Sequence, residues 1–415
     1  MQRTSESLAD WPRRLWHMAE EWAGRHAAQW TEWHVVPRGD RYIAENGSAI
    51  LGVCKALSEA AQESGVDSTV IVDRDAEHQA GPYVRAIRYH GIRESRIGRL
   101  VGKARLVGLG TGYADGLDID YSGDSPAVIY LHNRPWAVGA FRERFPDAFI
   151  SLYLHNSTMR GVPPRSIRRC ISNFDQVVCV SDYLRNDLIR RAKIDNGMTA
   201  AKVIVVNNAV DSTRFSKVTP VDCDVLYVGR VIPEKGLKVL LDCLTDVRLS
   251  KVRTKVLGGH TFLPGNLSDY ELECRNIVES NKLHVEFLGP LSPSRVPEFM
   301  NRSKILVVPS TWDDPCPLVV LEGRASRAAV VASRVGGIPE IGDCSRGVVL
   351  FNRGDSLSLA DILVRLLRDE SARLQIVTNG QSTARAWTWG DAYAQLRASR
   401  QTTSPARSIA RETER

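Results

Sequence analysis

The sequence lacks the features that mark several large classes of protein. Its eight cysteines are scattered, with neither a Cys-x-x-Cys pair nor a cluster with histidine, which argues against a zinc site and against a disulfide framework in a chain of 415 residues. No apolar run approaches the roughly 20 residues that cross a membrane, and the N-terminus lacks the apolar core and cleavage site of a signal peptide. These absences predict a cytoplasmic protein with reduced thiols.

Short motifs for common ligands are also missing. No Gly-Lys-Ser/Thr sequence occurs, so a P-loop is excluded. The glycine-rich run at 108–112 mimics a dinucleotide-binding loop, but Tyr113 holds the place of its last glycine. Asp118 and Asp120 mimic a metal-binding pair, within a polar stretch that we expect to be a loop. We therefore expect no bound metal ion and no tightly bound cofactor.

The net charge of +7 is unevenly distributed. Ile97, Leu100 and Val101 fall at helical spacing within residues 85–105, a segment rich in cations. Its cations are Arg85, Arg88, Arg93, Arg96, Arg99, Lys103 and Arg105. Such a segment favours either a basic helix on an anionic membrane surface or a surface helix packed on its own domain. Its later cations have no interleaved aromatic residues for base stacking, so we expect no nucleic-acid partner.

The length and the strand pattern predict two domains. Short β-rich runs separated by helix-like stretches are typical of parallel sheets wrapped by helices. In the first half they fall at 70–72, 128–131, 150–154, 177–180 and 203–206, and in the second at 225–228, 255–257, 285–288, 305–308 and 330–332. Ligands of such open sheets bind beside the carboxyl ends of the strands, so we expect the site in a cleft between two facing sheets.

Composition sets the expected boundaries. We expect a Trp-rich helical extension at 1–30 and a first Rossmann-like domain at 31–212. A polar linker at 213–220 would lead into a second Rossmann-like domain at 221–385. The tail at 399–415 is expected to be disordered.

Two carboxylates flank a strand-to-helix turn in the second half. The apolar run 305–308 leads into a polar turn that holds Asp314, and a helix-like stretch that holds Glu322 leaves it. The helix start offers unpaired N–H groups to a phosphate, with Leu318 and Val319 in its first turn. Carboxylates accept hydrogen bonds from sugar hydroxyls. This combination predicts a nucleotide-sugar site.

A second motif follows the first strand of this half. Gly229 ends the run 225–228, Arg230 follows at once, and Lys235 opens the next helix. Arginine offers a planar fork and lysine a point charge, so the two together can neutralise a diphosphate.

Together these segments resemble the GT-B glycosyltransferases of family GT4, over about residues 35–396. The second half carries Gly229-Arg230, Pro233-Glu234-Lys235-Gly236, Phe287-Leu288-Gly289, the paired acids and Gly336-Gly337-Ile338-Pro339-Glu340, and the first half carries Val180-Ser181 and Asn207-Asn208-Ala209-Val210-Asp211. The resemblance implies an α/β fold in which two Rossmann-like parallel-sheet domains face a central cleft. The first domain would bind the acceptor and the second the nucleotide-sugar. A helix at 386–398, following Trp387-Thr388-Trp389, would cross back onto the first domain.

The resemblance also implies roles in the second half. Arg230 and Lys235 would hold the diphosphate, and Glu322 the ribose hydroxyls. Asp314 would touch the donor sugar. The remaining donor contacts would come from Gly229, the backbone at Leu318 and Val319, and a border for the base around Gly289 and Leu291. Two residues of this turn depart from the family. Asp314 stands where the family usually has glutamate, and Cys316-Pro317 stands where it usually has Phe-Gly. Proline removes a backbone N–H from the turn.

In the first half, Gly47 resembles the second glycine of the turn through which the family's backbone approaches the diphosphate, and Asn46 replaces the first. By resemblance His155, at the end of the run 150–154, lies beside the donor sugar at the reaction centre. With Arg230, Lys235 and Asp314 it would complete the catalytic set. His132 and Arg134 would lie nearer the acceptor.

The resemblance implies a retaining, metal-independent hexosyltransferase that takes a UDP- or GDP-sugar. The acceptor would be a polysaccharide or lipid-linked glycan intermediate at the inner face of the membrane. Because of the departures around Asp314, a nucleotide-binding partner subunit of a glycosyltransferase is a second hypothesis. A GT-B nucleotide-sugar epimerase is a third, although its acid and base carboxylates are not found in the matching places.

Overall fold

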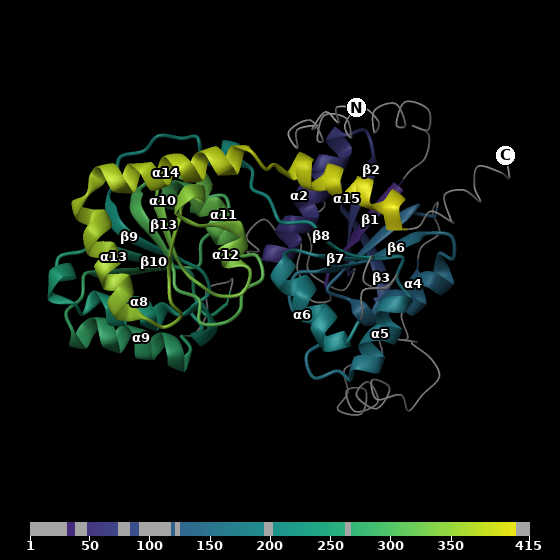
Figure 1. The fold of residues 1–415 in the computed structure, drawn as a ribbon, viewed down its shortest axis with the longest axis horizontal. Helices are drawn as coiled ribbons and strands as arrows, with labels where there is room; N and C mark the ends of the chain where they lie inside the picture. The colour runs from purple at the N-terminus through teal and green to yellow at the C-terminus, as the bar shows by residue number, and fades with distance from the viewer. Residues whose placement is uncertain are drawn as a thin grey trace, which may run out of the picture.

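The computed structural model describes residues 31–37, 48–73, 84–90, 118–120, 125–194, 202–261 and 267–403. These residues form two domains that lie side by side, each a β-sheet wrapped by helices (Figure 1). The Trp-rich stretch 1–30, Gly47, the glycine-rich run 108–112 and residues 91–105 of the basic segment lie outside the described part of the chain. So does the tail from 404 onward.

The first domain is built on an eight-stranded sheet of order β4-β3-β2-β1-β5-β6-β7-β8. Neighbouring strands are parallel except β3 and β4, which are antiparallel. Its elements are β1 (Thr31–Val35), α2 (Ala49–Glu63), β2 (Asp67–Asp73), β3 (Val84–His90), β4 (Asp118–Asp120), β5 (Val128–His132), α4 (Val138–Arg144), β6 (Phe149–Leu154), α5 (Pro164–Ser172), β7 (Gln176–Cys179), α6 (Asp182–Ala192) and β8 (Val203–Val205).

The polar residues Asp118–Asp120 form the edge strand β4, so the prediction that they lie in a loop is wrong. Ile119 pairs with Tyr89 of β3. An edge strand is held by backbone hydrogen bonds, which a polar sequence forms as readily as an apolar one. Arg85 and Arg88 of the basic segment lie on the strand β3.

The second domain is built on a six-stranded parallel sheet of order β11-β10-β9-β12-β13-β14. Its elements are β9 (Cys223–Val228), α8 (Leu237–Leu244), β10 (Thr254–Leu257), α9 (Asp269–Ser280), β11 (Val285–Gly289), α10 (Val296–Asn301), β12 (Ser303–Val308), α11 (Leu318–Ala325), β13 (Ala329–Ser333), α12 (Ile338–Ile341), β14 (Val348–Phe351), α13 (Ser356–Arg368), α14 (Glu370–Arg385) and α15 (Trp389–Thr403). The segment that joins the domains contains a short 3-10 helix, Ser212–Phe215.

Each sheet has one point where the strand order reverses. In the second sheet the reversal lies between β9 and β12, and in the first between β1 and β5. The loops that leave neighbouring strands there run in opposite directions, which opens a crevice for ligands at the carboxyl edge. The motifs found in the sequence follow β9 and β12.

The interior strands are buried on both faces. All five residues of β5 and all five of β13 are buried. Strands covered by helices on both sides read as continuous apolar runs, which is why these segments stood out in the sequence.

The chain crosses from the second domain back to the first. Helix α14 lies along the second domain, and α15 lies against α2 of the first (Figure 1). Inside that contact the guanidinium of Arg400 pairs with Glu32 at 2.7 Å, and the hydroxyl of Tyr393 donates to the same carboxylate at 3.2 Å. The predicted fold, with two facing Rossmann-like domains and a helix that crosses back, is confirmed. The helix ends at Thr403 and is therefore longer than the 386–398 segment expected.

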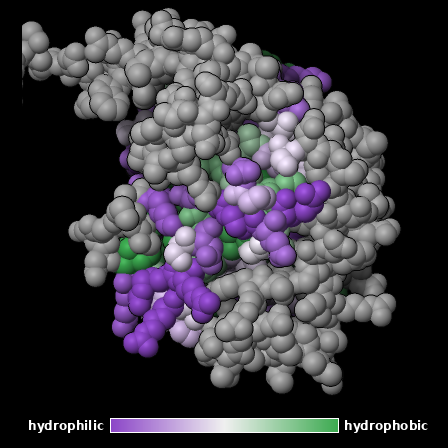
Figure 2. Space-filling model, turned by 90° about the vertical axis from the view of Figure 1, so that its right-hand side faces the viewer, coloured by the Kyte–Doolittle hydropathy of each residue, from purple (hydrophilic) through white to green (hydrophobic). Residues whose placement is uncertain are grey.

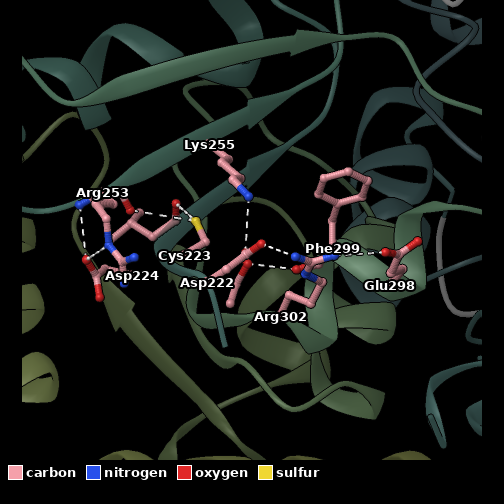
Figure 3. A network of polar contacts seen from close by, with 10 residues as sticks. Asp222, Cys223, Asp224, Arg253, Lys255, Glu298, Phe299 and Arg302 are labelled. Carbon is pink, nitrogen blue, oxygen red and sulfur yellow. Dashed lines mark hydrogen bonds and ion pairs between the residues drawn. The ribbon is translucent and has the colours of Figure 1, made fainter. Parts of the chain in front are cut away.

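The amino edge of the second sheet is fastened by ion pairs (Figure 3). Asp222, just before β9, pairs with Lys255 of β10 at 3.1 Å and with Arg302 just before β12. Asp224 pairs with Arg253 at 3.3 Å. These contacts tie three strands together at the edge opposite to the motif-bearing loops, so we read the network as structural.

The described surface at the first-domain end of the molecule is mainly hydrophilic, with small hydrophobic areas between the polar side chains (Figure 2). Among the described helices, none combines the length and the apolar character needed to cross a bilayer.

Candidate functional site

The loops after β9 and β12 interlock. A Cβ added to Gly236 would lie 1.9 Å from the carbonyl oxygen of Pro309, and Gly236 has a φ of +71°. Only glycine fits a position that is both left-handed and in such close contact. The backbone N–H of Thr311 also donates to the carbonyl of Glu234 at 2.9 Å. This interlocking brings Lys235 on one loop beside Asp314 on the other.

Lys235 and Asp314 form an ion pair across the two loops. The distance from Nζ to Oδ2 is 2.6 Å, and the side chains are 24% and 9% exposed. The ammonium also lies 5.4 Å from the centre of the Trp312 ring, within the range of a cation–π contact. The sequence therefore correctly placed both residues in one location. Their pairing shows that the carboxylate can orient the ammonium.

A third loop, after β13, holds the backbone of Asp314. The N–H of Gly337 donates to the Asp314 carbonyl at 2.9 Å. Cβ atoms on Gly336 and Gly337 would lie 2.3 and 1.8 Å from the carbonyl oxygens of Asp314 and Pro315. The two glycines thus allow this loop to lie directly against the turn that carries Asp314.

Helix α11 begins immediately after that turn. Pro317 occupies the N-cap position, with φ −69° and ψ 122°, and Leu318 and Val319 are the first two helical residues. Backbone N–H groups in a first helical turn have no acceptor within the helix and carry the positive end of its dipole. The departure from the family at Pro317 removes an N–H before the helix and leaves those of Leu318 and Val319 in place.

Glu322 lies one turn further along α11. Its carboxylate is 3.9 Å from the guanidinium of Arg214, in the segment that joins the domains. Burial raises the pKa of Glu322 above its ordinary value, and the Arg214 cation acts in the opposite direction. Sequence reasoning missed Arg214, because the contact joins residues far apart in the chain.

The other predicted donor-site residues follow the same edge of the sheet. Arg230 is exposed in the loop after β9, and its carbonyl accepts a hydrogen bond from Tyr227 at 2.7 Å. Gly289 ends β11 with a φ of +71°, and Leu291, two residues on, is half-buried. Gly229 takes a φ of +154° where the chain leaves β9.

In the first domain, three histidines form a hydrogen-bonded chain. His34 on β1 lies with Nδ1 3.0 Å from Nε2 of His132, at the end of β5. Nδ1 of His132 lies 2.8 Å from Nε2 of His155, which follows β6. Burial lowers the pKa of His34 and of His155 to about 3. Burial also lowers the pKa of His132 well below its ordinary value, with the neighbouring histidines acting in the same direction. All three rings are therefore neutral at physiological pH.

His132 does not fit the acceptor role expected for it. The side chain is fully buried, and both ring nitrogens are used by other histidines. It stands behind His155, which is half-buried. Arg134, two residues on, is also half-buried and stays a candidate for the acceptor side. His34 was missed because a single histidine within a short apolar strand carries no signal in the sequence.

The carboxyl edges of the two sheets meet through Glu340 of α12. Its carboxylate accepts hydrogen bonds from the backbone N–H groups of Asp182 and Tyr183, at 2.8 and 2.5 Å. These groups open helix α6 of the first domain. The side-chain amide of Asn208 also donates to the carbonyl of Cys316 at 3.2 Å. The histidine chain and the Lys235–Asp314 pair therefore lie on edges that face one another.

Two Rossmann-like domains with their strand-reversal loops turned toward each other define the GT-B class. Residues 53–214 match the family described as Glycosyltransferase Family 4, and residues 214–383 match the family described as Glycosyl transferases group 1. Between them these matches span most of both domains. The chain belongs to the GT4 family of GT-B glycosyltransferases.

Three relatives show how far the sequence similarity extends. An uncharacterized glycosyltransferase of Methanocaldococcus jannaschii is 28% identical over 52% of this chain and 57% of its own length. Spore coat protein SA of Bacillus subtilis is 25% identical over 52% of this chain and 61% of its own. The lipopolysaccharide 1,2-N-acetylglucosaminetransferase of Salmonella typhimurium is 26% identical over 62% of this chain and 67% of its own. The similarity thus spans little more than half of the first two relatives.

Solved structures share the whole fold. Anabaena HepE, in a complex with UDP, has a TM-score of 0.65 at 17% identity, covering 90% of this chain and all of that one. A sucrose-phosphate synthase from Thermosynechococcus elongatus has a TM-score of 0.68 at 18% identity, covering 91% of this chain and all of that one. At these identities the likeness establishes the fold.

Proposed function

We propose that this protein is a retaining hexosyltransferase that transfers a sugar from a UDP- or GDP-sugar to a polysaccharide or lipid-linked glycan intermediate. The observation that carries the proposal is the Lys235–Asp314 pair, held beside the start of α11 at the strand-order reversal of the second domain. UDP in the HepE complex supports a nucleotide-sugar as the donor class.

The chemistry demands a stabilised leaving group. Breaking the bond between a sugar and a nucleoside diphosphate builds negative charge on the phosphate and positive charge on the anomeric carbon. Arg230, Lys235 and the first-turn N–H groups at Leu318 and Val319 would stabilise the phosphate charge. Glu322 would accept hydrogen bonds from the ribose. Asp314, which orients Lys235, would also meet the donor sugar.

The first domain would supply the opposite wall. His155 would hydrogen bond the donor sugar from across the cleft, and Gly47 would let the backbone approach the diphosphate. Arg134 would contribute to the acceptor side. The Glu340 contact with α6 would hold the two walls together and limit the entry of water during transfer. We place the reaction at the cytoplasmic face of the membrane, where lipid-linked acceptors would be found.

The proposal is tested by sugar transfer from UDP- and GDP-hexoses, in wild type and in Lys235→Ala. Loss of transfer is expected in the variant, with an unchanged circular dichroism spectrum and a retained cooperative unfolding transition. Lys238→Ala, a nearby half-exposed cation on α8, serves as the matched control and should transfer normally. Transfer at the wild-type rate by Lys235→Ala would refute the assignment. Product formed without an acceptor would indicate an epimerase, and binding without turnover a partner subunit.

A further inference from the structure

The histidine chain has a property that its separate members lack. Each ring is neutral, and a neutral imidazole has one N–H donor and one bare nitrogen. His132 uses both nitrogens, one toward His34 and one toward His155. The three rings must therefore be polarised in the same direction, either from His34 toward His155 or in reverse. The tautomer of one ring fixes the tautomers of the other two.

The far end of the chain distinguishes the two directions. Nε2 of His34 is buried and makes no hydrogen bond within the described part of the chain. In the reverse direction this nitrogen would carry a buried proton with no acceptor among the described residues. Burial and the Arg400 cation both lower the pKa of His34, and the cation would repel that proton. In the forward direction the same nitrogen carries only a lone pair, which a nearby cation favours. The forward direction, from His34 to His155, is therefore preferred.

Aromatic stacking holds the rings in this geometry. The His34 ring stacks on Tyr130 with centroids 4.8 Å apart, and the His132 ring stacks on Tyr153 at the same distance. The His132 and His155 rings lie side by side at 19° to one another, with centroids 5.1 Å apart, a separation that fits the in-plane hydrogen bond between them. The backbone N–H of His155 donates to the side chain of Asn133 at 2.9 Å, which fixes the last member. Rings that are stacked on tyrosines and hydrogen-bonded to one another cannot turn over to exchange their nitrogens without breaking those contacts.

We propose that His34 and His132 are positioning residues that hold His155 as its Nδ1–H tautomer, so that the cleft-side ring presents a hydrogen-bond donor. The forward direction makes Nε2 of His155 an acceptor and leaves the proton on Nδ1. That nitrogen makes no hydrogen bond to any described residue. The group it suits is an oxygen acceptor of the nucleotide-sugar, a sugar hydroxyl or a phosphate oxygen. This inference rests on the proposed function for the identity of the ligand, although the tautomer itself does not.

The tautomer is measured first, without any ligand. Long-range 15N–1H correlation spectra of protein labelled with 15N-histidine separate the two neutral tautomers, and the His155 signals are assigned by their loss in His155→Gln. Wild type should show protonated Nδ1 and bare Nε2. His34→Leu removes the terminal donor and should shift His155 to a mixture of tautomers. His34→Asn, whose amide N–H can take the place of Nδ1–H, should restore the wild-type pattern. A wild-type His155 protonated on Nε2, or a tautomer that does not respond to His34→Leu, would overturn the inference.

Kinetic measurements then test whether the His155 tautomer affects the use of the nucleotide-sugar. His34→Leu should lower kcat/KM for the nucleotide-sugar by about tenfold, the value of one hydrogen bond, and His34→Asn should stay within about threefold of wild type. Inhibition by free UDP or GDP separates the two acceptors: a weakened inhibitor constant in His34→Leu indicates a phosphate oxygen, and an unchanged one a sugar hydroxyl. Equal losses in both variants, in step with their melting temperatures, would show a packing role and contradict the proposal. If no sugar is transferred from any donor, the proposed function fails while the tautomer measurement still decides this inference.

Discussion

Glu340 of the second domain caps a helix of the first, accepting a hydrogen bond from the backbone N–H of Tyr183 at 2.5 Å. A carboxylate at a helix N-terminus is stabilised by the helix dipole as well as by the N–H groups. The residue belongs to the motif Gly336–Glu340, and the glycines of that motif hold the turn that carries Asp314. One short segment therefore contacts both the donor-site turn and the opposite domain.

Glu340→Gln should loosen the contact between the domains. The amide keeps one oxygen acceptor but loses the charge and the second oxygen, so the closed arrangement should be less populated. We expect a larger radius of gyration by small-angle X-ray scattering and a KM for the nucleotide-sugar that rises severalfold. Glu279→Gln, an exposed glutamate at the end of α9, is the control and should change neither. Unchanged scattering and kinetics in Glu340→Gln would show that this contact does not hold the domains together.

Gly236→Ala should lower the stability of the second domain by more than the cost of placing alanine at a left-handed φ. Gly65 and Gly354 have the same left-handed φ, +76° and +74°, but a Cβ on either would meet nothing within 4 Å. Alanine there should cost about 1 kcal/mol. At Gly236 the clash with Pro309 adds to that strain, and we expect about 3 kcal/mol or more in urea unfolding. Equal losses at all three glycines would contradict the interlocking of the loops.

Glu322 should give nucleotide binding an unusual dependence on pH. Because burial raises the pKa of Glu322, its carboxylate takes up a proton at a higher pH in the folded protein than in the unfolded chain. The contribution of this group to stability therefore falls as pH rises between those two pKa values. Its acceptor role is lost in the opposite direction, as pH falls through the folded pKa.

As pH is lowered, nucleotide affinity should therefore begin to fall at a higher pH than the protonation of an ordinary glutamate would give. Glu322→Gln should bind less tightly at neutral pH, lose this pH dependence, and unfold at no lower a urea concentration than wild type. Calorimetric titration of UDP or GDP across pH measures the first two effects. An affinity in the variant that matches wild type at every pH would exclude Glu322 from the site.

Arg400 should be essential for the docking of α15. Removing one partner of a buried pair leaves the other charged and unpaired, at a cost of about 3–5 kcal/mol, so Arg400→Ala should lower stability by about that amount. The exposed Arg385→Ala on α14 should change it by less than about 0.5 kcal/mol. A double variant, Glu32→Gln with Arg400→Met, should recover part of the loss. A single variant as stable as wild type would show that the helix is held by other contacts.

The fold was largely predictable because its signals are local. Ten short β-rich runs, such as 128–131 and 225–228, coincide with strands β5 and β9 and with eight others. Parallel strands covered on both faces must be apolar throughout, so they are conspicuous. The strands β3, β4 and β14 were not foreseen. A charged alternating run and three polar residues carry little β signal, which explains the first two. The third is an apolar run of only four residues, which periodicity alone does not identify as a strand.

Only those site residues that lie within short sequence motifs could be predicted. Lys235 and Asp314 come together as expected, since Gly236 follows Lys235 and lets its loop lie against the loop that carries Asp314. His34, Arg214 and the partner of Glu340 were not predictable. Their contacts join residues 98, 108 and 157 positions apart. The first depends on the strand order within one sheet, and the last on how the two domains are placed. A buried histidine in a strand looks like any other core residue until its neighbours are known.

The most direct measurement is a crystal structure with a UDP- or GDP-hexose bound. It should place the diphosphate within hydrogen-bond distance of Lys235 and of the N–H groups at the start of α11, with the ribose against Glu322. A nucleotide bound elsewhere, with Lys235 still paired only to Asp314, would contradict the account.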